Sequence, residues 1–396
     1  MKNLLLATAA STALGSTAIA GGHEINIGVI LGFTGPIESL TPQMADSAEL
    51  AMKEVSDSGA FLDGNVLVPV RADSTCVDAA AAAAAAERLI TADGVAAIMG
   101  ADCSGVTTAI ANNVAIPNGV VMVSPSATSP ALSTIEDNGL FFRTAPSDAR
   151  QGDVLANILM DKQITEVAVT YTNNDYGKGF SDAFASSYEA LGGSITISAA
   201  HEDGKGDYSA EVGALAAAGG DLLVVLGYAD QGGLGIIQSS LDTGAFDTFA
   251  MGDGMYADSL LEALGGDMEG SVGSVPWSEG EGADAFAALT EAAGVNGDSA
   301  FTRESYDAAA LIALAMQKGG EASREAVAAN LLDVANAPGE PILPGELGKA
   351  LEILAGGGDI DYVGATNVEL IGPGEAAGTY REYVITGGAY ETVQFR

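Results

Sequence analysis

The chain has 396 residues, of which 53 are acidic and 15 are basic, and its formal net charge at pH 7 is −38. Such a charge excludes nucleic acids and anionic membrane surfaces as expected partners, because both would repel the chain. Hydrophobic residues make up 48% of the sequence, which is enough for large buried cores and excludes a disordered protein.

The first 20 residues are predicted to be a secretory signal peptide. Lys2 precedes an apolar stretch, and the small-residue triplet Ala18-Ile19-Ala20 predicts cleavage after Ala20. This stretch is too short to span a bilayer, and no later segment has the pattern of a membrane helix. We therefore expect an exported protein in the periplasm, long enough for two domains.

Strands and helices alternate through the first part of the mature chain. The predicted strands are 25–31, 65–72, 95–100 and 119–123, and the predicted helices begin near Pro42, Ala79 and Gly105. The run of eight alanines from Ala79 follows Asp78 and precedes a glycine stop, so it predicts a strong helix rather than a low-complexity segment.

The same alternation restarts further along the chain. Here the predicted strands are 166–172, 194–199, 221–228 and 248–253, and the predicted helices are 148–161, 179–191, one from Tyr208 and one from about Gln231. Beyond residue 277 the pattern is mostly helical, with helices predicted at 284–293, 303–317 and 323–334.

Two successive sets of βα units predict an α/β protein with two doubly wound parallel sheets. No flexible tether separates the sets, so we expect two lobes joined by crossing hinge strands, with a cleft between them. The expected division places residues 21–145 and 277–362 in the first lobe and residues 146–276 and 363–396 in the second.

Polar side chains follow the predicted strands at the ends where open parallel sheets bind ligands. In the first lobe, Ser104 and Thr128 follow neighbouring strands and could hold an anion such as a carboxylate. In the second lobe, Asp253 could hold an ammonium group, and Tyr176 and Tyr228 could pack on an apolar side chain. Each has a simpler structural interpretation, as an N-cap for Ser104, a turn residue for Thr128 and Asp253, or core edge for the tyrosines.

Signatures of catalysis and metal binding are missing from the sequence. It has no G-x-S-x-G, Walker A or H-E-x-x-H motif, and its two histidines, His23 and His201, have no second ligand at zinc-like spacing. We therefore expect no enzyme, no metal and no cofactor. The two cysteines, Cys76 and Cys103, could pair in an oxidising compartment or be unrelated buried thiols.

Several motifs together resemble one known family, the periplasmic solute-binding proteins of branched-chain amino acid ABC transporters, which have the type I binding-protein fold. IGVILGFTGP is similar to the family's opening strand and turn, and RADSTCVDAAAAAAAAERLI to the strand, cysteine and helix that follow. IMGADCSGVT and SPSATSPAL resemble two binding loops, FFRTAPSDARQG the crossover, and NDYGKG a tyrosine-containing loop. The resemblance covers essentially the whole mature chain.

The resemblance implies a role for each matching residue. Ser104 and Thr128 would bind the ligand carboxylate through hydroxyl and backbone N–H groups, and Ser126 would offer its backbone carbonyl to the ammonium group. Asp253 stands where the family has a glutamate for that ammonium.

The resemblance further implies that Tyr176 and Tyr228 are the family's tyrosines of the second lobe and that Phe301 is an aromatic beside the side-chain pocket. It also implies a disulfide between Cys76 and Cys103.

The chain departs from the family at the pocket. An aromatic expected after TGP is absent, with Leu40 or its neighbours in its place, and Glu38 adds a charge near the mouth of the cleft. Asp253 is one methylene shorter than the family's glutamate. Larger or more polar amino acids, or amides, therefore stay open as ligands.

The resemblance implies the binding component of an ABC importer, which binds a small amino acid between its lobes, delivers it to a membrane permease and acts as a monomer. A sensory binding protein of the same fold is one alternative, and a binder of amides or of carboxylates without an amine is another. A secreted enzyme is disfavoured, because no pair of nucleophile and base is evident.

Overall fold

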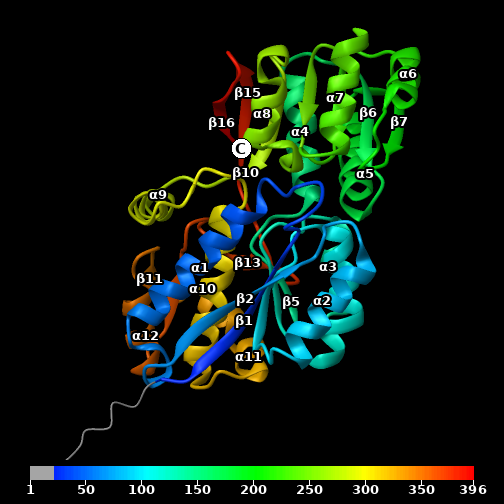
Figure 1. The fold of residues 1–396 in the computed structure, drawn as a ribbon. Coiled ribbons are helices and arrows are strands. Elements are labelled where there is room, and N and C mark those ends of the chain that lie inside the picture. The colour runs from blue at the N-terminus through cyan, green and yellow to red at the C-terminus, as the bar shows by residue number, and fades with distance from the viewer. Residues whose placement is uncertain (1–21) are drawn as a thin grey trace, which may run out of the picture.

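The computed structural model describes residues 22–396, so the predicted signal peptide lies outside the described residues. These residues form two α/β lobes, each built around a seven-stranded sheet (Figure 1). Within this range, no helix combines the length and the apolar character needed to cross a membrane. The predicted class, two lobes with helix-covered and mainly parallel sheets, is confirmed.

The sheet of the first lobe has the strand order β13-β14-β5-β4-β3-β1-β2. Five of its strands lie side by side in the order β2-β1-β3-β4-β5, and each pairs in parallel with the next. β3 and β4 are buried along their whole length, which explains why the sequence shows them as continuous apolar runs. The bounds are β1 Glu24–Leu31, β2 Val66–Asp73, β3 Ala97–Gly100, β4 Met122–Ser124, β5 Phe141–Arg143, β13 Leu370–Ile371 and β14 Glu375–Ala376.

Helices cover both faces of this sheet, with α1 packed on α10 on one side and α2 packed on α3 on the other (Figure 1). The alanine run forms α2, as predicted: the Asp78 carboxylate accepts the N–H groups of Ala80 and Ala81 and so caps the helix. The bounds are α1 Thr41–Asp57, α2 Ala79–Thr91, α3 Ser104–Ile110, α10 Thr302–Gly319, α11 Arg324–Ala335 and α12 Leu347–Ala355.

The sheet of the second lobe repeats this arrangement, with the order β16-β15-β10-β9-β8-β6-β7. β6 to β10 pair in parallel, and β15 and β16 add an antiparallel edge. The bounds are β6 Glu166–Thr172, β7 Ser194–His201, β8 Leu222–Leu226, β9 Phe249–Met251, β10 Val272–Pro276, β15 Tyr380–Thr386 and β16 Ala389–Phe395.

The helices of the second lobe include one that starts earlier than predicted. α5 begins at Asp175 rather than at Gly179, because the Asn174 side chain accepts the Gly177 N–H at 3.0 Å and caps the helix there. Tyr176 therefore lies in the first helical turn. The bounds are α4 Asp148–Asp161, α5 Asp175–Ala190, α6 Ser209–Ala218, α7 Gly232–Thr243 and α8 Asp258–Leu264.

The chain passes between the sheets three times: between β5 and α4, after β10, and between β14 and β15. α9 (Glu281–Ala293) follows the second passage, and β11 (Glu340–Ile342) pairs with β12 (Ile360–Tyr362) in a small separate sheet. Residues 363–396 were all expected to belong to the second lobe, but the pairing of β13 and β14 differs from this expectation. β13 and β14 extend the first sheet, and strands of two residues leave no periodicity to read in the sequence. We therefore propose that the last lobe boundary lies between Ala376 and Tyr380.

Candidate ligand-binding site

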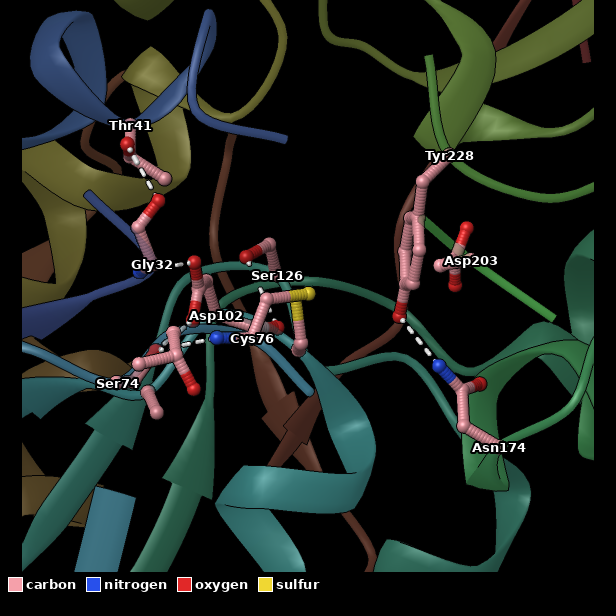
Figure 2. The surroundings of a disulfide bond; sticks show 12 residues. Gly32, Thr41, Ser74, Cys76, Asp102, Ser126, Asn174, Asp203 and Tyr228 are labelled. Carbon is pink, nitrogen blue, oxygen red and sulfur yellow. Dashed lines mark hydrogen bonds between the residues drawn. A yellow bond between two sulfur atoms is a disulfide. The ribbon is translucent and has the colours of Figure 1, made fainter. Parts of the chain in front are cut away.

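In both sheets the parallel strands follow the same order, β2-β1-β3-β4-β5 in the first and β7-β6-β8-β9-β10 in the second. Each sheet therefore has one pair of adjacent strands whose connections to the next element run in opposite directions. In open α/β sheets, ligands bind beyond the carboxyl ends of the strands at that point. In the first lobe the point lies between β1 and β3, which are followed by Gly32 and Asp102. In the second it lies between β6 and β8, which are followed by Asn174 and Tyr228. Figure 2 shows these two pairs on facing sides of the space beside Ser126.

A small cavity lies between the lobes. Both lobes line it, and hydroxyl, carboxyl, aromatic and aliphatic groups all reach it. The first lobe contributes Ile37, Leu40, Asp102, Cys103, Ser104, Ser126 and Phe301, and the second contributes Tyr176, Tyr228, Asp253 and Gly254. The structure thus brings together six of the seven residues that the sequence singled out, and Thr128 is the one that does not line the cavity.

The serines of the first lobe are tied to one another. Ser104 is the first residue of α3, and Cys103 holds the N-cap position, so the simpler N-cap interpretation of Ser104 is wrong. The Ser104 hydroxyl instead accepts the Ser129 N–H at 3.1 Å and connects the two loops. Ser126 donates its hydroxyl to the backbone carbonyl of Asp102 at 3.2 Å.

Thr128 lies next to the cavity, at the junction of the lobes. Its side chain is fully buried, and its hydroxyl has no hydrogen-bond partner among the described residues. Its carbonyl accepts the N–H of Asp148, the first residue of α4, at 2.8 Å. Thr128 therefore links the serine loop to the start of the second lobe.

Asp253 is the buried acid on the side of the second lobe. Two glycines flank it because side chains there would collide with its surroundings: a Cβ on Gly252 would lie 2.5 Å from the Phe180 ring, and a Cβ on Gly254 would lie 2.6 Å from the carbonyl of Gly227. The Tyr176 hydroxyl donates to Oδ1 of Asp253 at 2.9 Å. Burial raises the pKa of Asp253 to about 6, so the group is mostly ionised at neutral pH.

A second acid, Asp148, is buried close to Asp253. Neither of its carboxyl oxygens has a hydrogen-bond partner among residues 22–396. Burial, and then the charge of Asp253, raise the pKa of Asp148 well above its ordinary value. Two neighbouring acids do not both ionise readily in a dry interior, so a charge on either one raises the pKa of the other.

Aromatic rings form one wall of the cavity. Tyr176 and Tyr228 are stacked, with ring centroids 5.1 Å apart, and the Tyr228 hydroxyl accepts a hydrogen bond of 3.3 Å from Asn174. Phe301 lines the cavity from the first lobe and comes just before α10, with a φ of +62° in the left-handed region. That conformation is uncommon for a bulky residue and is typical of a functional constraint.

The predicted disulfide between Cys76 and Cys103 is present. It joins the loop after β2 to the residue that precedes Ser104, directly beside the cavity (Figure 2). The loop that contains Cys103 and Ser104 was therefore predicted correctly. The adjacent Asp102 was not predicted as a site residue, and the only indication in the sequence was its position after the same strand as Ser104.

The lobes also touch at the rim of the cleft, where Asp230 of the second lobe meets the loop after β1. The Asp230 N–H donates to the Pro36 carbonyl at 3.0 Å, and its carboxylate accepts the Ser39 N–H at 2.8 Å and the Ser259 hydroxyl at 2.7 Å. Glu38, in the same loop, is exposed and accepts the Gly35 N–H at 3.4 Å, and it does not line the cavity. The structure is thus that of the closed cleft.

Comparison with known proteins gives the chain its relatives. The family model described as periplasmic binding protein matches residues 24–347. A Leu/Ile/Val-binding protein of Rhizobium johnstonii is 30% identical over 338 residues, which cover 83% of this chain and 90% of the relative. A chemotactic signal transduction system substrate-binding protein of Halobacterium salinarum is 28% identical over 380 residues, covering 94% of this chain and 89% of the relative.

Solved structures share the fold at lower sequence identity. A leucine-binding protein from Thermotoga maritima superposes with a TM-score of 0.78 at 23% identity, over 94% of this chain and 98% of that one. A solute-binding protein of an ABC transporter from R. palustris, in complex with 4-hydroxybenzoate, gives a TM-score of 0.74 at 19% identity, over 94% and 97% of the two chains.

Proposed function

The chain belongs to the periplasmic binding protein family, whose members bind solutes and are not enzymes, and we propose that it captures a small amino acid for an ABC importer. The observation that carries this proposal is the closed cavity, which has hydroxyl groups on one lobe and the charged Asp253 on the other. The ligand would lie between the lobes and be delivered to a membrane permease.

The carboxylate of the ligand would be held by the first lobe. Ser104 lines the cavity, and the nearby Thr128 hydroxyl is buried beside the Asp148 carboxyl without a well-formed hydrogen bond among residues 22–396. Leaving a buried hydroxyl unpaired costs about 1–3 kcal/mol. A small rotation of the loop that follows β4 would let Thr128 and backbone N–H groups share the carboxylate with Ser104.

The ammonium group would be held by Asp253, with the carbonyl of Ser126 as a further acceptor. Asp253 is buried, and among residues 22–396 no lysine, arginine or histidine lines the cavity. A buried charge without a partner is costly, and an ammonium group would remove that cost. Tyr176 would orient the carboxylate, and Tyr228 and Phe301 would enclose the side chain.

Binding would stabilise the closed form because only that form brings both ends of the ligand to their partners. The ligand thus shifts an existing equilibrium between open and closed forms. The three passages between the lobes form the hinge, and the Asp230 contacts with Pro36 and Ser39 would form only on closure.

Two alternatives are kept because relatives favour them. The Halobacterium salinarum relative belongs to a chemotactic signalling system, and genes for a permease and ATPase next to this gene, rather than for a receptor, would support transport. The R. palustris structure holds 4-hydroxybenzoate, an acid without an amine. The charged Asp253 argues against such a ligand here. Its carboxylate would face either the negative charge or the neutral ring of the ligand, and neither offers an ammonium group.

The test is a thermal-shift screen of the mature protein after unfolding and refolding to remove any retained ligand. The probes are the amino acids, short amides, and benzoate and 4-hydroxybenzoate. Stabilisation by amino acids, followed by titration calorimetry, would support the proposal. Stabilisation only by amine-free acids would reject the role of Asp253. Light scattering on the same sample tests the expected monomer.

A further inference from the structure

The motif NDYGKG places two glycines near the start of α5, where alanine would stabilise the helix more. Gly177 has an explanation within its own lobe, because a Cβ there would lie 2.2 Å from the carbonyl oxygen of Thr172. The nearest neighbours of Gly179 lie in the other lobe. A Cβ on Gly179 would lie 2.9 Å from Cδ of Pro130 and 3.0 Å from Oγ of Ser129.

These neighbours place the first lobe directly against α5. Ser129 and Pro130 stand between β4 and β5 of the first sheet, and Pro130 begins the short 3₁₀ helix η4 (Pro130–Thr134). α5 connects β6 and β7 of the second sheet and approaches α3 of the first lobe (Figure 1). Carbon atoms in contact are normally about 3.5–4.0 Å apart, so a methyl group on Gly179 would overlap the Pro130 ring. The two lobes meet here with no room for a side chain.

The first-lobe side of this contact is held in place by several bonds. The Ser129 N–H donates to the Ser104 hydroxyl at 3.1 Å, and the Ser129 carbonyl accepts from the Arg143 guanidinium at 2.9 Å. The Ser129 hydroxyl crosses between the lobes and donates to the Asp175 carbonyl at 3.1 Å. Pro130 follows directly, and its ring fixes the backbone φ. Ser129 and Pro130 therefore cannot easily move away from α5.

The helix side of the contact is tied to the candidate site. Tyr176 lies three residues before Gly179 and therefore on the same face of α5, and its hydroxyl donates to Oδ1 of Asp253 at 2.9 Å. A shift of α5 away from Pro130 would carry Tyr176 away from the serines of the first lobe. The close approach at Gly179 thus sets how near the two halves of the site come to each other.

We infer that Gly179 is the contact that limits closure: the cleft reaches its closed form only because position 179 has no side chain. This inference rests on the proposed function, since it requires the ligand to be bound by closure of the lobes. When the lobes separate, position 179 turns toward solvent, and alanine fits there as it does on any exposed helix. The same substitution therefore has opposite effects on the open and the closed form.

The test measures stability and affinity on one variant, Gly179→Ala, in the refolded mature protein. Without ligand, its melting temperature should equal or exceed that of the wild type, because alanine favours the helix. Titration calorimetry measures dissociation constants for leucine, threonine and glutamine. Each should rise about tenfold or more, because overpacking penalises only the closed form. The factor should be the same for all three probes, since Gly179 does not line the ligand cavity.

Gly213→Ala in α6 is the matched control. Gly213 also lies inside a helix, and apart from that helix a Cβ there would have no heavy atom within 4 Å. This variant should gain stability without losing affinity. Pro130→Ala provides the rescue, because it removes the ring carbon nearest to the added methyl group. Gly179→Ala should therefore cost less affinity in a Pro130→Ala background than in the wild type.

A ligand-free Gly179→Ala variant less stable than the wild type would overturn the inference, because the contact would then persist in the open form. Unchanged affinity, unequal factors among the probes, or an equal loss in the Pro130→Ala background would overturn it as well. If none of the three probes binds the wild type, the ligand-free comparison decides the inference alone. Failure of every amino acid in the thermal-shift screen would reject the proposed function.

Discussion

The hydroxyl of Tyr176 donates a hydrogen bond of 2.9 Å to Oδ1 of Asp253 and thereby fixes the buried acid that faces the cavity. The same hydroxyl accepts the Gly254 N–H at 3.2 Å. One tyrosine therefore holds both the carboxylate and the loop that carries it. The acid is oriented before any ligand arrives, which reduces the ordering that binding has to supply.

Replacing Asp253 by alanine should abolish most of the affinity for amino acids. Removing one partner of a buried charge pair costs about 2–5 kcal/mol, which corresponds to roughly 30-fold or more in the dissociation constant. Ser126→Ala should have a much smaller effect, because Ser126 is expected to act through its backbone. Titration calorimetry on both variants measures the difference, and equal losses would contradict this division of roles.

Affinity should fall as the pH drops through about 6. Burial raises the pKa of Asp253 to about 6, and an ammonium group prefers the ionised form. Below that pH the protein must lose a proton before it binds, so the affinity should fall by about tenfold for each further pH unit. Burial and the charge of Asp253 also raise the pKa of Asp148 well above its ordinary value.

Calorimetry between pH 5 and pH 8 measures this dependence, with Asp253→Asn as the control. The residual affinity of that variant should be nearly constant across the range. A wild-type affinity that does not change between pH 5 and pH 7 would show that Asp253 does not hold the ammonium group.

Glu304 should make the fold less stable as the pH rises. Burial raises the pKa of this residue of α10 to about 8, above its ordinary value of 4.5. Between these two values the folded protein retains a proton that the unfolded chain releases, so the free energy of unfolding decreases with rising pH. We expect Glu304→Gln to match the wild type near pH 5 and to exceed it by roughly 1–3 kcal/mol near pH 8.

Urea unfolding at both pH values tests this difference, and the exposed acid Glu262 provides the control. Glu262→Gln should alter stability equally little at pH 5 and pH 8. A Glu304→Gln variant whose stability relative to wild type is the same at both pH values would mean that Glu304 is ionised throughout.

Replacing Asp230 by alanine should weaken every ligand by the same factor. The hydrogen bonds of Asp230 to Pro36 and Ser39 join the two lobes at the rim and involve no residue that reads the ligand chemically. The substitution removes the bond from the Ser39 N–H to the Asp230 carboxylate but keeps the backbone bond to Pro36. This loss should cost the closed form about 1–2 kcal/mol, or roughly 5- to 30-fold in affinity. Glu262→Ala, on the nearby α8, is the matched control, and calorimetry with two different ligands is the measurement. A change in the ratio of the two affinities would contradict this prediction and would mean that Asp230 contributes to ligand selection.

Much of this molecule could be predicted from sequence because buried parallel strands leave continuous apolar runs. The strands around residues 98 and 224 are two such cases, and the polar residues after them mark the cleft. The start of α5 was predicted four residues too late, since the cap made by Asn174 depends on one side-chain hydrogen bond.

The site was harder to predict than the fold because lining a cavity depends on where a side chain points. Thr128 lies in the expected loop, yet it does not reach the cavity. No role was predicted for Asp102. Its contacts with Gly32 and Ser74, which are distant in sequence, become visible only in three dimensions.

The contacts of Asp230 at the rim have a wider consequence. They join the two lobes outside the cavity, whereas Asp253 lines the cavity in which the proposed ligand would lie. If the proposed function holds, the stability of the closed form and the selection of the ligand would depend on different residues. Substitutions at the rim alone could then change the affinity during evolution without changing which ligand is selected.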